Sequence, residues 1–180
     1  MADYITTYSK VHFTPLEPKT EDILIDDIAH ALSLITRANG HFSSFYSVAQ
    51  HCIACCEEAL ARNYSEKVAL GCLLHDGSEA YIGDITRPLK KNLTKYLEIE
   101  EVLQGVIYDK YIGDKFTEEE REQIISVDDT MLFYEFKHFA GEELFLNKSE
   151  LMSNPVFQTV EFSKVEEKYK ELFYKLIKEV

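Results

Sequence analysis

The sequence predicts an all-α fold, a compact helical bundle with a short extended or hairpin segment at its N-terminus. Apolar side chains recur at helical spacing along most of the chain, and helix-start signals precede several of these stretches. The sequence contains no repeat, no low-complexity tract and no long linker. Its 180 residues, 46% of them hydrophobic, suffice for one sizeable core and are too few to favour two. We therefore expect a single domain over residues 1–180.

Extended chain and then two helices are expected in the first third of the sequence. The first twenty residues mix aromatic and β-branched side chains with Thr, Ser and Pro, which favours an extended or hairpin segment. Residues 26–38 carry apolar side chains at helical spacing, and Gly40 marks the expected end of that helix. Arg37 would then lie in its last turn. A second helix is expected over residues 46–63.

The next helices are predicted mainly from their start signals. Ser65 suits the N-cap of a third helix, which we expect to end near Gly83. An amphipathic stretch follows over residues 93–107. Thr117 and Glu120 form a capping box before a long helix.

A closing helix is expected after another capping box, formed by Ser163 and Glu166. This helix carries an apolar stripe made of Tyr169, Leu172, Phe173, Leu176 and Ile177. The stripe either completes the core or packs on a second subunit.

The acidic composition narrows the choice of partners. The formal net charge is −13, from 19 basic and 32 acidic residues, which argues against a long basic groove for polymeric DNA or RNA. Residues 86–95 are an exception, because they carry four cations and no acid. This basic segment either holds the phosphate of a small anionic substrate or forms a solvated turn and helix start.

Several features are typical of a cytoplasmic protein. No charged segment followed by an apolar one opens the sequence, and no apolar run approaches membrane-spanning length. The cysteines are confined to two adjacent segments, which suits reduced core thiols better than a disulfide framework or a zinc ribbon. They are Cys52, Cys55, Cys56 and Cys72. We expect a cytoplasmic protein that contacts no membrane.

Residues 73–84 begin with apolar side chains and then contain one histidine and three carboxylates. In a helix, Glu79 would lie four residues from His75 and three from Asp76, so these side chains would share one face. Asp84 lies five residues further on. Adjacent His and Asp can both face a metal ion. The alternative is a set of solvated acids near a helix end, beside a histidine without a ligand role.

A metal site would need further ligands from other helices, and His51 and Asp128 are the best candidates. His51 is next to the apolar stripe that contains Cys52, so its imidazole is expected to point partly inward. Asp128 shares a helix face with apolar residues, where an ionised carboxylate is costly unless it pairs or binds a metal. Asp129 competes for this role because its surroundings are similar. We prefer Asp128.

The order of these residues resembles the H…HD…D pattern of the HD-domain metal-dependent phosphohydrolases. Residues 45–51 resemble the segment around the first histidine of that family, and residues 75–90 resemble the core of bacterial 5′-deoxynucleotidases and related bacterial and phage nucleotide hydrolases. The resemblance covers about residues 26–139. It implies a helical bundle with one divalent cation, Mn²⁺, Co²⁺, Zn²⁺ or Mg²⁺, at its centre. The implied ligands are His51, His75, Asp76 and Asp128.

The resemblance also implies roles for residues around the metal. Glu79 would be the general acid or base, and Asp84 would assist it or grip the sugar. The residues that would bind phosphate are Arg37, His41 and Lys90. Arg87 and Lys91 would contribute only to the local field.

Two positions depart from the pattern of the family. Gln50 stands before His51 where relatives often have Glu, and Gly77 follows the His-Asp pair where a small Ala is common. A glutamine cannot supply the negative charge that a glutamate would bring near an imidazole.

These observations favour an enzyme that removes the 5′-phosphate of deoxynucleoside monophosphates. One alternative is a deoxynucleoside triphosphohydrolase that uses the basic segment more heavily. Another is a nucleotide-binding regulatory module without turnover, and a third is a structural helical protein. Because members of the family usually assemble, we expect a homo-oligomer, a dimer or larger.

Overall fold

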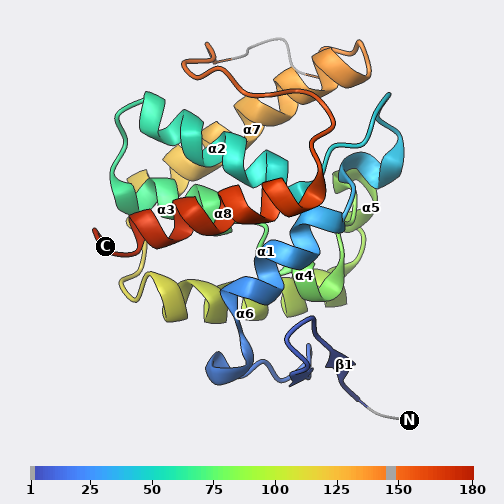
Figure 1. The fold of residues 1–180 in the computed structure, drawn as a ribbon, viewed down its shortest axis with the longest axis vertical. Helices are drawn as coiled ribbons and strands as arrows, with labels where there is room; N and C mark the ends of the chain where they lie inside the picture. The colour runs from blue at the N-terminus through green and yellow to red at the C-terminus, as the bar shows by residue number, and fades with distance from the viewer. Residues whose placement is uncertain (1–2, 145–148) are drawn as a thin grey trace.

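Helices form the body of the molecule, and a short hairpin lies at its N-terminal end (Figure 1). The computed structural model describes residues 3–144 and 149–180. The long helices are α1 (Ile25–Leu34), α2 (Val48–Ala61), α3 (Glu66–Leu74), α6 (Thr94–Tyr111), α7 (Glu118–Phe139) and α8 (Phe162–Leu176). Shorter helices are η1 (Thr20–Asp22), η2 (Arg37–Gly40), α4 (Glu79–Ile82) and α5 (Arg87–Lys90). The predicted all-α class is confirmed.

The core forms around α2 and α3. Helices α1 and α8 lie side by side over one side of this pair, and α7 contacts it from another side (Figure 1). One cluster of buried apolar residues includes side chains from each of these five helices. The four cysteines are free and buried within this cluster, as predicted for core thiols.

The predicted N-terminal hairpin is confirmed. Strands β1 (Ile5–Thr6) and β2 (His12–Phe13) pair antiparallel. The hairpin is attached to the bundle by a hydrogen bond and by ring stacking. The backbone N–H of Ser9 donates to Asp27 Oδ1 over 2.6 Å, and the buried ring of Phe13 stacks on Tyr81.

Helix α1 ends earlier than predicted, so the prediction that Arg37 lies in its last turn is wrong. Ile35 already has extended backbone angles, and its carbonyl accepts from Val48 N over 3.0 Å. Arg37 N in turn donates to Tyr46 O over 2.9 Å. These tertiary hydrogen bonds compete with the helical ones, and Arg37 lies in the separate turn η2.

Helix α2 begins at a capping box that was not predicted. The Ser47 hydroxyl accepts from Gln50 N, and Gln50 Oε1 accepts from Ser47 N, each over 3.2 Å. The amide of Gln50 also donates to Gln158 O over 2.9 Å. Gln50 therefore fixes the start of α2, and it also holds the segment that contains Gln158 against this helix.

The third helix begins at Ser65, as predicted, but it does not continue to Gly83. Helix α3 ends at Leu74, and a turn separates it from α4. Gly77 lies in this turn at a close approach: a Cβ there would be 2.9 Å from Leu74 O and 3.3 Å from Ile107 Cδ1. The turn brings His75, Asp76 and Glu79 near one another without a continuous helix.

Of the two later capping boxes, one is confirmed and one is wrong. Thr117 and Glu120 cap α7 as predicted. The N-cap of α8 is Glu161, whose side chain makes no capping bond, so Ser163 lies inside the first turn. Glu166 instead pairs with His30 over 2.9 Å. The apolar stripe of α8 packs on the bundle, so it completes the core.

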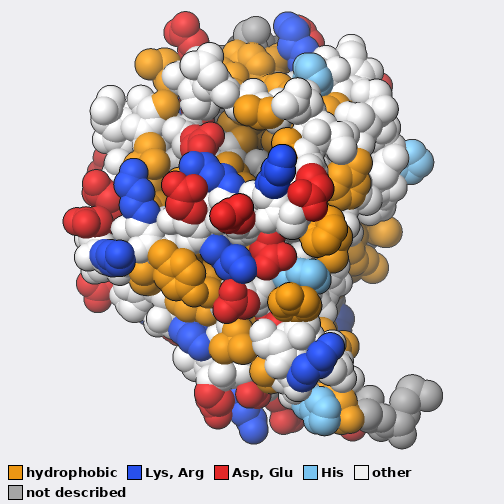
Figure 2. All heavy atoms as spheres, viewed as in Figure 1, with side chains coloured by type: hydrophobic (Ala, Val, Ile, Leu, Met, Phe, Trp, Pro, Cys, Tyr) orange, Lys and Arg blue, Asp and Glu red, His pale blue; other side chains and the backbone are white. Residues whose placement is uncertain are grey.

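Acidic and basic side chains are mixed on the surface over α1 and α8 (Figure 2). Among the described residues, no helix combines the length and apolar character needed to cross a membrane.

Candidate metal centre

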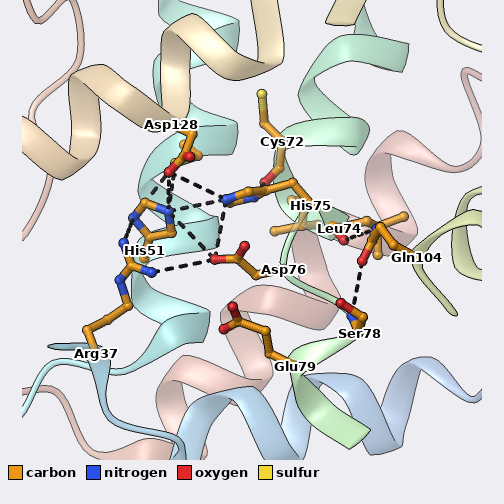
Figure 3. A network of polar contacts seen from close by, with 12 residues as sticks. Arg37, His51, Cys72, Leu74, His75, Asp76, Ser78, Glu79, Gln104 and Asp128 are labelled. Carbon is orange, nitrogen blue, oxygen red and sulfur yellow. Dashed lines mark hydrogen bonds and ion pairs between the residues drawn. The ribbon is translucent and has the colours of Figure 1, made fainter. Parts of the chain in front are cut away.

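Four predicted ligands from three parts of the fold lie close together (Figure 3). They belong to two overlapping groups that could hold a metal ion, one with His51, His75 and Asp128 and the other with His75 and Asp76. His51 Nε2, on α2, lies 3.2 Å from His75 Nε2 and 3.1 Å from Asp128 Oδ1 on α7. Asp76 Oδ2 lies 3.3 Å from His75 Nε2 and 3.8 Å from His51 Nε2. Donor atoms that share one transition-metal ion at about 2.0–2.2 Å are separated by about 3–4 Å. Side chains that could hold a metal ion are therefore clustered here.

The outer nitrogens of both imidazoles are occupied by other partners. His75 Nδ1 donates to the carbonyl of Cys72 over 2.7 Å, and His51 Nδ1 lies 2.7 Å from Glu135 Oε1. With the proton on Nδ1, each Nε2 presents a lone pair. Two nitrogen lone pairs that face each other at 3.2 Å repel unless a proton or a metal cation lies between or beside them. This arrangement is typical of metal-binding histidines.

The carboxylates of the cluster are partly exposed, at 16% for Asp76 and 23% for Asp128, and both are anionic. Burial opposes ionisation of Asp128, but contacts with His51 and His75 outweigh it and hold its pKa well below the usual range. Burial likewise opposes ionisation of Asp76, and the pKa is nevertheless lowered by His75, His51 and Arg37. Asp76 Oδ2 is buried without a hydrogen-bond partner. An orphaned carboxylate oxygen beside two imidazole nitrogens fits a metal ligand.

The second oxygen of Asp128 is held by Arg87. Arg87 Nη2 donates to Asp128 Oδ2 over 2.6 Å, and Nη1 donates to Asp129 Oδ1 over 2.7 Å. The Asp129 side chain is 46% exposed, so Asp128 is the member of the pair that faces the cluster. Arg87 thus pairs directly with a candidate ligand, and its predicted contribution to the local field stays a prediction.

Two cysteines lie close to the cluster but fit a ligand role poorly. Cys55 Sγ is 3.6 Å from His51 Nε2 and 3.9 Å from Nδ1, so the sulfur packs against the ring. A thiolate sharing an ion with Nε2 would lie clearly farther from Nδ1. Burial raises the pKa of Cys55, and it raises that of Cys52 to about 11. Both are therefore thiols while no ion is bound, although each belongs to a group that could hold a metal ion.

A cavity of about 410 Å³ opens beside the cluster, and both polar and apolar residues line it. Its volume is within the range of small-molecule sites. The polar lining residues are Arg37, Asp76, Glu79, Asp84, Thr86, Arg87, Lys90 and Asp128. The apolar lining residues are Ala38, Phe42, Ile85, Pro88, Leu132, Phe136 and Leu144.

Glu79 and Asp84 face this cavity outside the set of four ligands. Glu79 is 3% exposed, and its Oε2 has no hydrogen-bond partner. Burial, with Asp76 and Asp84 nearby, raises the pKa of Glu79 well above its usual value. Burial also raises the pKa of Asp84, which follows Gly83 in its left-handed turn (φ +80°). A carboxyl group whose pKa is raised in this way is suited to hold a proton and pass it to a reacting group.

The predicted phosphate-binding residues differ in their placement. Arg37 is mostly buried, and its Nη1 lies 3.6 Å from Asp76 Oδ2 at the cavity wall. Lys90 also lines the cavity and pairs with Glu100 on α6 over 2.5 Å. His41 is exposed and is absent from the described cavity lining. A phosphate-binding role for each of the three stays a prediction.

Sequence reasoning missed Glu135, which supplies the negative charge near His51 that Gln50 does not. Glu135 lies seven residues after Asp128 on α7, and this spacing places both carboxylates on one helix face. The seven-residue spacing from Asp128 is the sequence signal that could have identified Glu135.

Comparison with known proteins finds similarity over part of the chain, and no model of a protein family matches it. The chain is 43% identical over 108 residues to "Uncharacterized protein YfdR" of Escherichia coli K12, which covers 60% of this chain and 58% of that protein. It is 37% identical over 99 residues to "Uncharacterized protein RCAP_rcc00048" of Rhodobacter capsulatus, which covers 52% and 50%. The chain thus spans between half and three fifths of the length of these curated relatives.

Proposed function

We propose that this protein is an HD-domain-type metal-dependent phosphohydrolase that removes the 5′-phosphate from deoxynucleoside monophosphates. The observation that carries the proposal is the pair of facing Nε2 atoms of His51 and His75, flanked by the anionic carboxylates of Asp76 and Asp128. Mixed imidazole and carboxylate donors suit Mn²⁺, Co²⁺, Zn²⁺ or Mg²⁺. A divalent ion held there would supply Lewis-acid polarisation of a phosphoryl oxygen and of water.

The residues beside this set suit proton transfer. Glu79 faces the same cavity as Asp76 but has no place among the four donors. In the proposed reaction, its carboxylate takes a proton from the attacking water and returns it to the leaving oxygen of the sugar. Asp84 shares this negative environment and assists Glu79 or holds a sugar hydroxyl.

The cations that line the cavity support a substrate that is a phosphate ester of limited negative charge. Arg37, Arg87 and Lys90 line it and can neutralise phosphate oxygens. Of the basic segment 86–95, Lys95 is 81% exposed in its side chain and pairs with Glu98 instead. A triphosphate would require more cations than the cavity wall provides, which favours the monophosphate over the triphosphate alternative.

The apolar residues of the cavity lining support a nucleoside over a bare sugar phosphate. Phe42 and Phe136 lie edge to face with ring centroids 5.1 Å apart, and both line the cavity. Aromatic surfaces of this kind accept a flat nucleobase without selecting a particular base.

The cytoplasm is the proposed compartment, because the described cysteines are free and buried. The predicted homo-oligomer and the absence of polymeric nucleic acid partners stay predictions.

A substrate panel tests the proposal. The protein, loaded in turn with Mn²⁺, Co²⁺, Zn²⁺ and Mg²⁺, would be incubated with deoxynucleoside mono- and triphosphates, and the phosphorus product identified by ³¹P NMR. We expect orthophosphate from the monophosphates. Tripolyphosphate would support the triphosphohydrolase instead, and no hydrolysis of any nucleotide with any of the four metals would refute both enzymes.

Glu79→Ala separates the enzyme from a binding module. Under our proposal this variant binds nucleotide and loses turnover by about 10²-fold or more. A wild-type protein that binds nucleotide as the variant does, while neither hydrolyses it, would support the regulatory module.

A further inference from the structure

Glu135 is a buried carboxylate with two functional neighbours. Its side chain is fully buried, and it lies on α7 two turns beyond Asp128. Oε1 is 2.7 Å from His51 Nδ1, and Oε2 is 3.3 Å from Arg37 Nη2. Arg37 Nη2 also lies 3.3 Å from His51 Nδ1, so the three side chains form a closed triangle. Burying a carboxylate here is costly unless both oxygens find positive or donor partners.

We propose that Glu135 is a positioning residue that orients the metal ligand His51 and the phosphate-binding Arg37 together. This inference rests on the proposed metal site. One oxygen of Glu135 accepts a hydrogen bond from the Nδ1–H of His51 and thereby turns Nε2 toward Asp128. The other oxygen accepts from Nη2 of the Arg37 guanidinium, and Nη1 then points toward Asp76 in the cavity wall. A single carboxylate thus fixes the ring angle of one residue and the reach of the other.

The geometry distinguishes positioning from simple charge burial. A carboxylate needed only to neutralise Arg37 would not have to accept from the outer nitrogen of a candidate ligand. Carboxylates bonded to metal-binding histidines typically contribute about 10- to 100-fold to metal affinity. Loss of Glu135 should therefore weaken metal binding as well as the fold.

Glu58 provides a matched control. It is a second fully buried glutamate with an arginine partner, since Arg62 Nε donates to Glu58 Oε1 over 2.8 Å. Glu58 also lies on a helix of the core, α2, but it is absent from the described lining of the cavity. Substitution at either glutamate removes a buried negative charge, and only the change at Glu135 removes a contact with a candidate ligand.

The experiment measures Mn²⁺ and Co²⁺ affinity by titration calorimetry for wild type, Glu135→Gln and Glu58→Gln, with melting temperatures recorded alongside. We expect the dissociation constant of Glu135→Gln to rise about 10- to 100-fold and that of Glu58→Gln to stay within about twofold of wild type. Both variants should melt at lower temperature. The visible spectrum of bound Co²⁺ should change only in the Glu135 variant, because it reports the orientation of the ligands.

Glu135→Asp keeps the proposal testable if the glutamine variant fails to fold. The shorter side chain retains the negative charge, so we expect metal affinity between those of wild type and Glu135→Gln. Equal affinity in wild type and both Glu135 variants would overturn the positioning role and leave the proposed function intact. A wild-type protein that binds neither ion would overturn both.

Discussion

At the scale of single residues, the candidate ligands are held at the atoms that face away from the cluster. His75 is held by a backbone carbonyl, His51 by Glu135 and Asp128 by Arg87. Each contact leaves the opposite atom of the ligand directed at the common centre (Figure 3). Such outer contacts reduce the reorganisation needed when an ion binds.

The aromatic residues of the cavity lining give a prediction at this scale. Phe136→Ala removes a half-buried ring that lines the cavity, and base–aromatic stacking contributes about 1–3 kcal/mol per base. We expect KM for deoxynucleoside monophosphates to rise about tenfold. Hydrolysis of a small alkyl phosphate, which has no base to stack, should change little. Steady-state kinetics with the two kinds of ester measure the difference.

Phe162→Ala is the control, because this ring is 41% exposed at the start of α8 and is absent from the described cavity lining. Equal loss of activity toward both esters in Phe136→Ala would contradict a role in holding the base.

The sequence reveals ligands more readily than the residues that support them. His51 and Asp128 stand out because polar groups on apolar helix faces need a reason to be there. Glu135 and Arg87 look like ordinary charged surface residues in the sequence. Their roles depend on which faces of α7 and α5 meet the cluster, and tertiary packing alone decides that.

At the scale of elements, the contact between α3 and α7 sets the separation of two ligands. His75 follows the end of α3, and Asp128 lies on α7. Gly71 on α3 permits the close approach: a Cβ there would be 2.7 Å from both Ile124 Cδ1 and Phe116 Cζ.

Two glycine substitutions, one at this contact and one away from it, should change stability in opposite directions. Gly71→Ala should lower stability by about 1–3 kcal/mol, because the added methyl overpacks the contact. Gly105→Ala should raise stability by up to about 1 kcal/mol, because Gly105 is inside α6 and an added Cβ meets nothing within 4 Å. Denaturant unfolding followed by circular dichroism measures both. A Gly71→Ala protein as stable as wild type would contradict the account.

The sequence predicts which segments form helices more reliably than it predicts where those helices end. The caps of α3 and α7 were predicted because a local side chain makes them. The early end of α1 was not, since hydrogen bonds of Ile35 and Arg37 to residues 46–48 override the local helical preference. The break after α3 depends on a tight backbone approach at Gly77 that no periodicity reports.

At the scale of the whole molecule, a buried network joins segments that are distant in sequence. Glu58 accepts from the backbone of Met152 and Ser153, and Arg62 donates to Ser126 and Thr130 on α7. The network therefore fixes the chain after residue 149 against α2 and α7. The all-α bundle was predicted as a whole, yet this connection through residues 151–160 has no sequence signature.

Glu58 should make stability depend on acid pH. Burial opposes its ionisation, but hydrogen bonds from Ser153, Met152 and Arg62 outweigh it and lower its pKa. Its contribution is therefore present above the unfolded pKa, about 4.3, and is lost as pH falls through the lower folded pKa. Glu58→Gln should lower the melting temperature at pH 7 and flatten its fall in acid.

Thermal unfolding between about pH 3 and 7, in the presence of a chelator, measures this effect. Glu171→Gln is the control, because that side chain is 68% exposed and should follow the wild-type curve. Parallel curves for wild type and Glu58→Gln would show that Glu58 is not responsible for the acid sensitivity.

The central claim is that His51, His75, Asp76 and Asp128 hold one divalent ion, and anomalous X-ray diffraction from crystals grown with Mn²⁺ tests it most directly. The account predicts a single strong anomalous peak about 2.0–2.2 Å from His51 Nε2, His75 Nε2, Asp76 Oδ2 and Asp128 Oδ1. A map without a peak among these atoms at saturating Mn²⁺, or with the ion bound elsewhere, would contradict it.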